Sequence, residues 1–285
     1  MSTAEACLRP GAIGLIVTGA AGRMGKRIIA LAAEEPGRFK VAGALDRAEC
    51  LVLGQDAGKV AGAGELGVVL TTTIPAGLGS NSETAASGPV VIDFSAAAAT
   101  RGLIGECQRR HIAMVIGTTG LTADDHKLID QAAKTIPILQ ATNTSMGVNV
   151  LQKLVADAAR QLGDDYDIEI VEAHHNLKKD APSGTALSLA ESICRATGRK
   201  LEKDLVHGRE GKEALRAKGT IGMHAVRMGD VVGEHTVYFA AMCERLEIKH
   251  VASSRDTLAR GALRAAAWIA GQKPGRYTMA NVLGL

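Results

Sequence analysis

The segment between residues 172 and 185 concentrates side chains that can move protons and hold anions. It reads Glu172-Ala173-His174-His175-Asn176-Leu177-Lys178-Lys179-Asp180-Ala181-Pro182-Ser183-Gly184-Thr185. An imidazole with an ordinary pKa of ~6.5 can donate a proton near neutral pH, which makes His174 a candidate acid. Lys178 can supply positive charge to a developing anion or to a carboxylate. The segment therefore predicts catalysis on an anionic substrate.

The end of this segment predicts a carboxylate site. Ser183, Gly184 and Thr185 stand where a helix is expected to begin, so backbone N–H groups and two hydroxyls would meet a positive helix terminus. The alternative is a solvated loop in which Ser183 only caps the helix. Metal binding is a weaker alternative, because adjacent histidines on an extended strand face opposite sides and no third ligand lies nearby.

A second group of residues could hold a dinucleotide. Gly19-Ala20-Ala21-Gly22-Arg23-Met24-Gly25 is a G-x-x-G-x-x-G turn between an apolar run at 13–18 and helical spacing at 23–34. Such a site needs glycine at three positions: at the tight turn, at the point where the backbone approaches the pyrophosphate, and at the point where the helix packs on the strand. Asp46 closes the next apolar run and could accept hydrogen bonds from the adenosine ribose. The alternative is an ordinary glycine turn with Asp46 on the surface.

Arg47 bears on the choice of cofactor. Asp46 should repel a 2′-phosphate, whereas Arg47 could stack on adenine or pair with that phosphate. We therefore predict the use of both NADH and NADPH. Two later turns, Gly117-Thr118-Thr119-Gly120 and Ala141-Thr142-Asn143, follow further strands. Loops at the carboxyl ends of parallel strands line the ligand crevice, so these turns are candidates for contacts to the nicotinamide half.

The elements that must position these residues change character near residue 143. Before it, strands are predicted at 13–18, 39–45, 90–94, 112–116 and 136–139, with helices at 23–34, after 94 to about 110, and at 122–134. This alternation predicts βαβ crossovers and a parallel sheet with helices on both faces. Residues 48–88 show weak strand signals and are expected to form an irregular connection.

After residue 143 the predicted helices cover 146–162, 184–197 and 255–270, and a strand covers 167–172. Residues 219–252 alternate at period two with no helix of crossover length between the runs, which predicts an antiparallel or mixed sheet. We therefore expect an α/β dinucleotide-binding domain over 1–145 and an α+β substrate domain over 146–254. The open face of the second sheet could serve as a subunit interface.

Composition excludes several classes of protein. The 285 residues are 46% hydrophobic but only 2% aromatic, so the core must consist of Ala, Val, Leu and Ile, as in α/β proteins. A net charge of +3 without basic blocks gives no case for nucleic-acid binding. The apolar runs are far shorter than a membrane span of ~20 residues, and residues 1–10 lack the apolar segment of a secretory signal. Five scattered cysteines without a C-x-x-C pair predict no zinc site and reduced thiols in a cytoplasmic protein.

Together these motifs resemble the 4-hydroxy-tetrahydrodipicolinate reductase (dihydrodipicolinate reductase) family, which acts in the diaminopimelate branch of lysine biosynthesis. The resemblance runs through the chain in order. It rests on Gly22–Gly25, Asp93-Phe94, Gly117–Gly120, Glu172–His175 with Lys178, Asp180–Thr185, Gly208-Arg209, Gly229-Asp230 and Ser254-Arg255. The His-His…Lys…Ala-Pro-Ser-Gly-Thr stretch is the most specific of these.

The resemblance implies that NADH or NADPH, without a metal, reduces a cyclic imine with two carboxylates. It also implies a Rossmann domain completed by residues 255–285, and a homotetramer joined through the mixed sheets. His174 resembles the family's acid/base residue and Lys178 its companion proton donor, while His175, Ser183, Gly184 and Thr185 would hold the carboxylates. The implied cofactor positions are Gly19, Ala20, Ala21, Gly22, Arg23, Met24, Asp46, Arg47, Gly117, Thr118, Thr119, Ala141, Thr142, Asn143 and Thr144.

Two departures from the family pattern stand out. Thr144 occupies a position where many relatives carry phenylalanine, so an aromatic contact near the nicotinamide would be missing. Asn176-Leu177 and Lys179 replace residues often seen as Arg-His and Val, which changes the local charge. Two other functions stay open: another NAD(P)-dependent dehydrogenase of amino-acid metabolism, and a non-catalytic NAD(H)-binding redox sensor. A sensor would not need the proton donor that the His-His-x-x-Lys loop offers.

Overall fold

A computed structural model describes residues 11–79 and 88–285 of the chain, which divide into two compact units. Unit 1 consists of the described residues up to Met146 together with Asp256–Leu285, and unit 2 is Gly147–Arg255. Residues 1–10, on which the expectation of no secretory signal rests, lie outside the described residues. Within the described residues, no helix is both long enough and apolar enough to cross a membrane.

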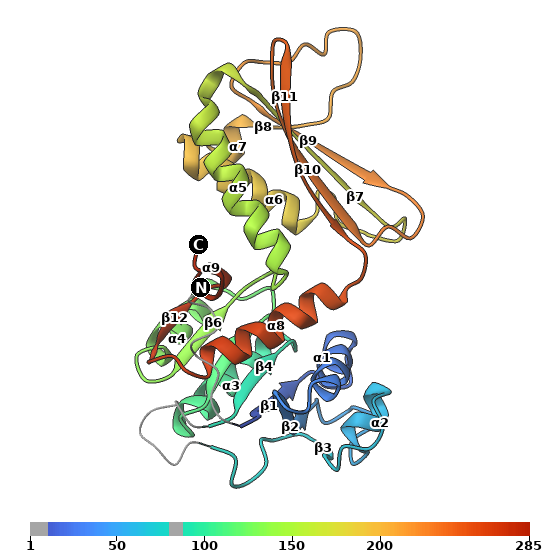
Figure 1. Ribbon diagram of the computed structural model, residues 1–285, viewed down its shortest axis with the longest axis vertical. Coiled ribbons are helices and arrows are strands. Elements are labelled where there is room, and N and C mark those ends of the chain that lie inside the picture. Colours follow the sequence, from blue (N-terminus) through green and yellow to red (C-terminus); the bar gives the residue numbers. More distant parts are fainter. Residues whose placement is uncertain (1–10, 80–87) are drawn as a thin grey trace. The chain divides into compact units, whose positions relative to one another are not determined.

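Unit 1 is built on a sheet in which, over the described residues, seven strands all run parallel to their neighbours (Figure 1). Their order is β12 (Gly275–Tyr277), β6 (Pro137–Gln140), β5 (Ala113–Ile116), β4 (Val90–Asp93), β1 (Ile13–Thr18), β2 (Phe39–Leu45) and β3 (Leu70–Thr71). The central strands β4 and β5 are buried at every residue, as a sheet covered on both faces requires. The chain order reverses at β1, where β2 lies on one side and β4 on the other, and ligands of open α/β sheets bind at such a point.

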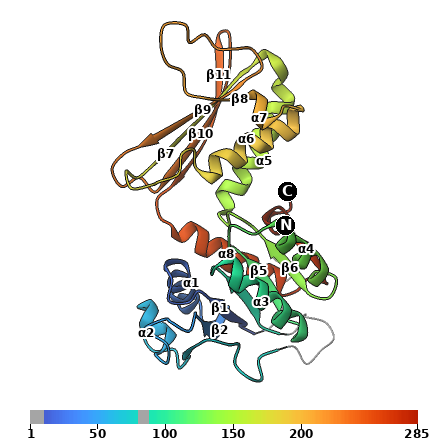
Figure 2. The same ribbon diagram turned by 180° about the vertical axis from the view of Figure 1, so that it is seen from behind.

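Helices cover both faces of this sheet. On one face, α1 (Arg23–Glu34) and α8 (Asp256–Ile269) pack against alternate residues of the strands, such as Leu15 and Val115. On the other face, α3 (Ala97–Arg109) and α4 (Ala123–Ala132) form a second core (Figure 2). A short helix, α9 (Met279–Leu283), follows β12 and adds Met279 and Val282 to the first core.

The expectation of an irregular connection over residues 48–88 was wrong for part of that segment. Helix α2 (Ala57–Ala61) and strand β3 lie within it. The Asp56 carboxylate caps α2 by accepting a hydrogen bond from Lys59 N at 3.0 Å, and Gly62 ends the helix in a left-handed conformation. Elements of five and two residues are too short to show a periodic pattern in sequence.

Unit 2 is built on a mixed sheet. Its strand order is β11 (Glu244–Ala252), β10 (Gly233–Ala241), β7 (Asp167–His174), β9 (Ile221–Arg227) and β8 (Leu205–His207). Strand β10 is antiparallel to β11 and β7, whereas β7, β9 and β8 run parallel. The predicted fold class is therefore confirmed.

Helices α5 (Met146–Leu162) and α6 (Gly184–Thr197) lie on one side of this sheet in both views (Figures 1 and 2). They form a core with alternate strand residues, among them Ile170 and Phe239. The short helices η2 (Gly163–Asp165) and α7 (Leu201–Asp204) complete the unit. Strand β7 continues to His174, two residues beyond the predicted strand end, and this places Glu172 and His174 on the helix-covered face.

Candidate active site

The glycine turn lies between β1 and α1 in unit 1. Gly19 has a φ of +65°, and a Cβ built there would lie 2.4 Å from the carbonyl oxygen of Phe94. A Cβ on Gly25 would lie 2.2 Å from the carbonyl oxygen of Gly19, so both positions require glycine. Helix α1 begins after Gly22, and no side chain caps its N-terminus. Its first N–H groups are suited to an anion, so this turn fits the pyrophosphate of a dinucleotide.

Asp46, directly after β2, lies against this turn. Its Oδ2 accepts a hydrogen bond from Ala21 N at 2.8 Å, and its Oδ1 accepts one from Arg47 N at 2.9 Å. The Arg47 side chain is exposed to solvent. Asp46 therefore holds the glycine turn in place, a role that its position in the sequence did not reveal.

A buried carboxylate ties together the loops at this edge of the sheet. Asp93, at the carboxyl end of β4, is 0% exposed. Its carboxylate accepts hydrogen bonds from the hydroxyls of Thr18 and Ser95 at 2.5 Å, Thr100 at 2.6 Å and Thr118 at 3.0 Å. We name these residues the Asp93 hydroxyl cluster. The cluster joins β1, β4, α3 and the loop after β5, and so fixes the loop that contains the predicted cofactor residues Gly117–Thr119.

The later turns are held by different means. Gly117 lies on the ring of Phe94, because a Cβ there would be 2.3 Å from that ring. Thr144 is 1% exposed, and its hydroxyl donates to the carbonyl oxygen of Leu258 at 2.7 Å, so its side chain anchors the first turn of α8. Thr142 is exposed. The cofactor contacts of these turns stay predictions.

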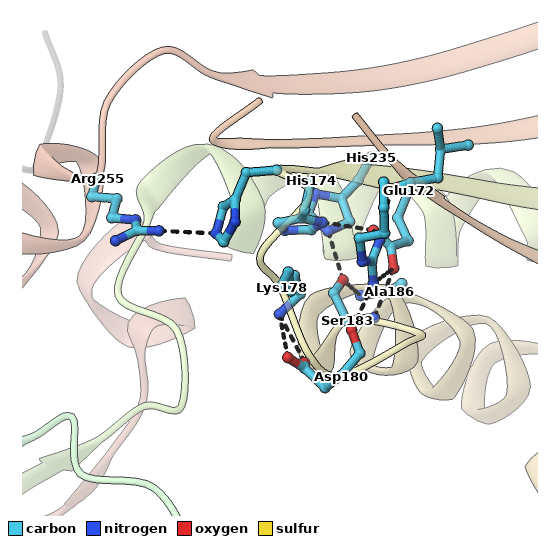
Figure 3. Close-up of polar contacts among 11 residues, drawn as sticks. Glu172, His174, Lys178, Asp180, Ser183, Ala186, His235 and Arg255 are labelled. Carbon is cyan, nitrogen blue, oxygen red and sulfur yellow. Dashed lines mark hydrogen bonds and ion pairs between the residues drawn. The ribbon is translucent and has the colours of Figure 1, made fainter. Parts of the chain in front are cut away.

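In unit 2 the side chains of the 172–185 segment gather where β7 ends (Figure 3). Glu172 is 0% exposed, and its Oε2 lies 2.6 Å from Nδ1 of His174. Arg227 of β9 donates to both carboxylate oxygens at 2.9 Å, and Ser183 N donates to Oε1 at 3.0 Å. With Nδ1 directed to Glu172, the Nε2 atom of His174 is the ring nitrogen that Glu172 does not contact.

The surroundings of this pair set its ionisation. Burial lowers the pKa of His174, the hydrogen bond that its Nδ1 donates to Glu172 raises it in part, and the charges of Lys178 and Arg227 lower it further. Burial acts to raise the pKa of Glu172, but hydrogen bonds from Arg227 and His174 outweigh that effect, so the net pKa is lowered. Glu172 is therefore ionised at neutral pH, and His174 exchanges its proton below the usual pH range of histidine.

The other predicted residues of this segment lie around the pair. The Nζ atom of Lys178 is 2.8 Å from both carboxylate oxygens of Asp180, so Lys178 does not stand free (Figure 3). Because Asp180 is largely exposed, that ion pair is worth about 0–1 kcal/mol and can open at little cost. The Nε2 atom of His175 lies 3.0 Å from a guanidinium nitrogen of Arg255. Ser183 caps α6, with Gly184 and Thr185 in the first turn.

Sequence reasoning missed residues that come from distant strands. Arg227 faces His174 because β9 runs parallel to β7 with these two residues in register. His235 of β10 lies opposite Glu172, and its Nε2 is 3.0 Å from the Ser183 hydroxyl oxygen. Only the strand pairing could have revealed these residues. Among the described residues, no three His, Cys, Asp or Glu side chains are placed to hold a metal ion.

The two units together define a class of protein. A parallel sheet with a glycine turn at its switch point and a separate unit with a carboxylate–imidazole pair are the parts of an NAD(P)-dependent oxidoreductase. Two family models match almost the whole chain: "Dihydrodipicolinate reductase, N-terminus" over residues 13–144 and "Dihydrodipicolinate reductase, C-terminus" over residues 147–283. The chain belongs to the dihydrodipicolinate reductase family.

Individual relatives agree with this assignment. The chain is 46% identical over 273 residues to the 4-hydroxy-tetrahydrodipicolinate reductase of Syntrophotalea carbinolica, covering 96% of this chain and 99% of that protein. A dipicolinate-bound dihydrodipicolinate reductase from Paenisporosarcina sp. TG-14 has a similar fold, with a TM-score of 0.69, 18% identity, and coverage of 94% and 97% of the two chains. An amine dehydrogenase from Mycobacterium smegmatis shares the fold at a TM-score of 0.60 and 13% identity, with 94% and 95% covered.

Proposed function

We propose that this chain catalyses the reduction of the cyclic imine 4-hydroxy-tetrahydrodipicolinate to tetrahydrodipicolinate with NADH or NADPH, in the diaminopimelate branch of lysine biosynthesis. The proposal depends above all on one observation, the buried Glu172–His174 pair beside the N-terminus of α6 in a chain of this family. The relative that is 46% identical carries the name of the same activity.

The chain's own residues supply the proton and hold the substrate. When bound, NADH or NADPH supplies a hydride to the ring carbon at the far end of the conjugated system. His174 donates a proton from Nε2 to the resulting enamine, aided by Lys178. The conjugated system forms when the substrate loses its hydroxyl group and a neighbouring ring proton as water. The overall reaction therefore consumes one hydride and one proton and releases one water. Solvent then returns a proton to His174.

The carboxylates of the substrate would be held where positive charge and hydrogen-bond donors lie close together. Gly184 and Thr185 form the first turn of α6, a helix of 14 residues whose N-terminus carries partial positive charge. His175 and Lys178 add donors from the loop before it. Holding both carboxylates fixes the ring relative to Nε2 of His174, and such orientation is a main source of rate enhancement.

A coupled assay tests the proposed function. Substrate is generated in situ, and oxidation of NADH and of NADPH is followed by absorbance. We expect turnover with both cofactors and inhibition by pyridine-2,6-dicarboxylate. Turnover only with another acceptor would favour a different amino-acid dehydrogenase, and cofactor binding without any turnover would favour a redox sensor.

For the cofactor, we propose that the glycine turn, Asp46 and Arg47 hold the adenosine half. Replacing Asp46 with Asn should raise the KM for NADH about three- to tenfold and change the KM for NADPH less, because an amide binds ribose hydroxyls more weakly than a carboxylate. Asn keeps an oxygen that can accept from Ala21 N, so the turn is retained. Glu49→Gln, a loss of the same charge at an exposed position nearby, is the control. Equal losses with both cofactors would contradict the role of Asp46.

The pH dependence should report His174. Only the protonated imidazole can donate, so kcat/KM should fall as pH rises through the pKa of His174 in the free enzyme, which lies below 6.5. A bound dianionic substrate favours the imidazolium, so kcat should fall at a higher pH than kcat/KM. Steady-state rates between about pH 5 and pH 11 check this order. A single fall near the ordinary lysine pKa of about 10.4 would assign the proton to Lys178 instead.

We also propose that the chains form a homotetramer through the mixed sheets. The side of the sheet away from α5 and α6 carries exposed apolar side chains such as Val226 and Val251, at 38% and 52% exposure. Sedimentation analysis should find a species of four chains of 29.6 kDa each.

A further inference from the structure

We propose that His235 is a positioning residue that makes the Ser183 hydroxyl a hydrogen-bond donor to a substrate carboxylate. The inference rests on the proposed function, because it concerns how the site recognises a dicarboxylate. His235 lies on β10, 52 residues from Ser183 in sequence, and it has no part in the proton transfer described above.

The geometry places Ser183 between a helix and a buried imidazole (Figure 3). Its Oγ atom lies 3.0 Å from Nε2 of His235 and accepts a hydrogen bond from Ala186 N at 3.2 Å. His235 is 4% exposed, and its ring meets that of His174 edge to face, with centroids 5.2 Å apart. The hydroxyl is therefore held at the junction of the cap of α6 and the proton-donating pair.

The position of the proton on the His235 ring determines whether the Ser183 hydroxyl accepts a hydrogen bond from the ring or donates one to it. Nδ1 of His235 is buried and has no hydrogen-bond partner among the described residues. A proton on Nδ1 would leave a buried N–H without an acceptor, and native structures tolerate orphaned donors less well than orphaned acceptors. We therefore place the imidazole proton on Nε2, where it is donated to Ser183. Both acceptor positions of the serine oxygen are then filled, by His235 and Ala186, and its O–H remains free to donate.

The charges around His235 favour this neutral form. Burial lowers the pKa of His235 to about 4, the charges of His174, His250 and Lys178 act in the same direction, and Glu172 opposes them. In the sheet, Glu172 of β7 and His250 of β11 flank His235 on the same face. The imidazole therefore stays neutral where the enzyme works, and Ser183 keeps one donor whatever the protonation state of His174.

A serine fixed as a donor selects for ligands that only accept. A carboxylate offers it an acceptor oxygen on either side, whereas a carboxamide offers one acceptor oxygen and one NH2 group that can only donate. Pyridine-2,6-dicarboxylate and its monoamide are therefore suitable probes. Wild-type protein should bind the dicarboxylate more tightly than the monoamide.

The test measures the Kd of pyridine-2,6-dicarboxylate by calorimetry with NADH present. His235→Leu should weaken binding by up to about 100-fold, the contribution of a hydrogen bond to a charged group, because the Ser183 hydroxyl loses the donor that orients it toward the carboxylate. The variant should raise KM more than it lowers kcat. His235→Gln should stay near wild type, since its amide nitrogen can take the place of Nε2. The shorter amide of His235→Asn reaches only the position of Nδ1, so this variant should bind the dicarboxylate as weakly as His235→Leu does. It replaces His235→Leu in the test if His235→Leu does not fold. In a chain that already carries Ser183→Ala, adding His235→Leu should not weaken binding of the dicarboxylate any further.

Several results would overturn the inference. Binding by His235→Leu at wild-type strength would do so, as would equal losses in His235→Gln and His235→Leu, or additive losses in the double variant. In each case wild-type turnover would leave the proposed function standing. A wild-type chain that binds NADH but neither binds the dicarboxylate nor reduces the cyclic imine would overturn both proposals.

Discussion

Replacing His174 with Gln should lower kcat by about 100- to 10,000-fold, the range that general acid catalysis contributes, while NADH binding changes little. The Gln side chain can still form a hydrogen bond with Glu172, but its amide has no proton to give near neutral pH. Cofactor binding is unaffected because the glycine turn belongs to unit 1. Steady-state rates and fluorescence titration with NADH check both parts.

His224→Gln is a matched control for this variant. His224 lies on β9 of the same sheet, but its Nε2 contacts Glu169 at 2.7 Å and not Glu172. The control should therefore keep its turnover. Rates for His174→Gln within a few-fold of wild type would show that another group donates the proton.

Glu172→Gln should reduce both turnover and stability. Glu172 is buried and binds Arg227 through both oxygens, so the amide would leave a largely buried guanidinium without a counter-charge. Breaking such a pair costs about 3 kcal/mol of unfolding free energy. Turnover falls as well, because the negative charge that helps His174 hold a proton is lost. Urea unfolding and steady-state kinetics measure the two effects.

A second substitution separates these effects. Adding Arg227→Met to Glu172→Gln removes the unpaired guanidinium and should restore part of the stability but none of the turnover. Wild-type stability in the single variant would mean that the ion pair contributes little. Recovery of turnover in the double variant would mean that Glu172 acts only through the fold.

Strong local patterns allowed the sequence to predict the longer elements. The predicted ranges 146–162 and 184–197 coincide with α5 and α6, because each has an apolar stripe at helical spacing, and Ser183 and Gly198 give α6 a capping residue and a left-handed end. The strand β12 has three residues and resembles a loop in sequence. Nothing local distinguishes so short a segment, whose pairing with β6 depends on the rest of unit 1.

The same contrast holds for the site. His174, Lys178 and Ser183 lie within ten residues, so their chemistry could be proposed from the sequence. Arg227 and His235 lie more than fifty residues from their partners. Period-two alternation gives the face on which each side chain lies but not which strands are neighbours, and the parallel pairing of β7 with β9 was not foreseeable.

The Asp93 hydroxyl cluster has a consequence for how this chain can diverge during evolution. Its acceptor is satisfied by hydroxyls from separate elements, and each of them can be exchanged between Ser and Thr without loss of the donor. Replacing any one of the hydroxyl residues with an apolar residue removes one hydrogen bond from the buried carboxylate. Replacing Asp93 itself removes the acceptor of all these hydroxyls at once. Asp93 is therefore the member of the cluster that should be substituted last during evolution, although it takes no part in the proposed reaction.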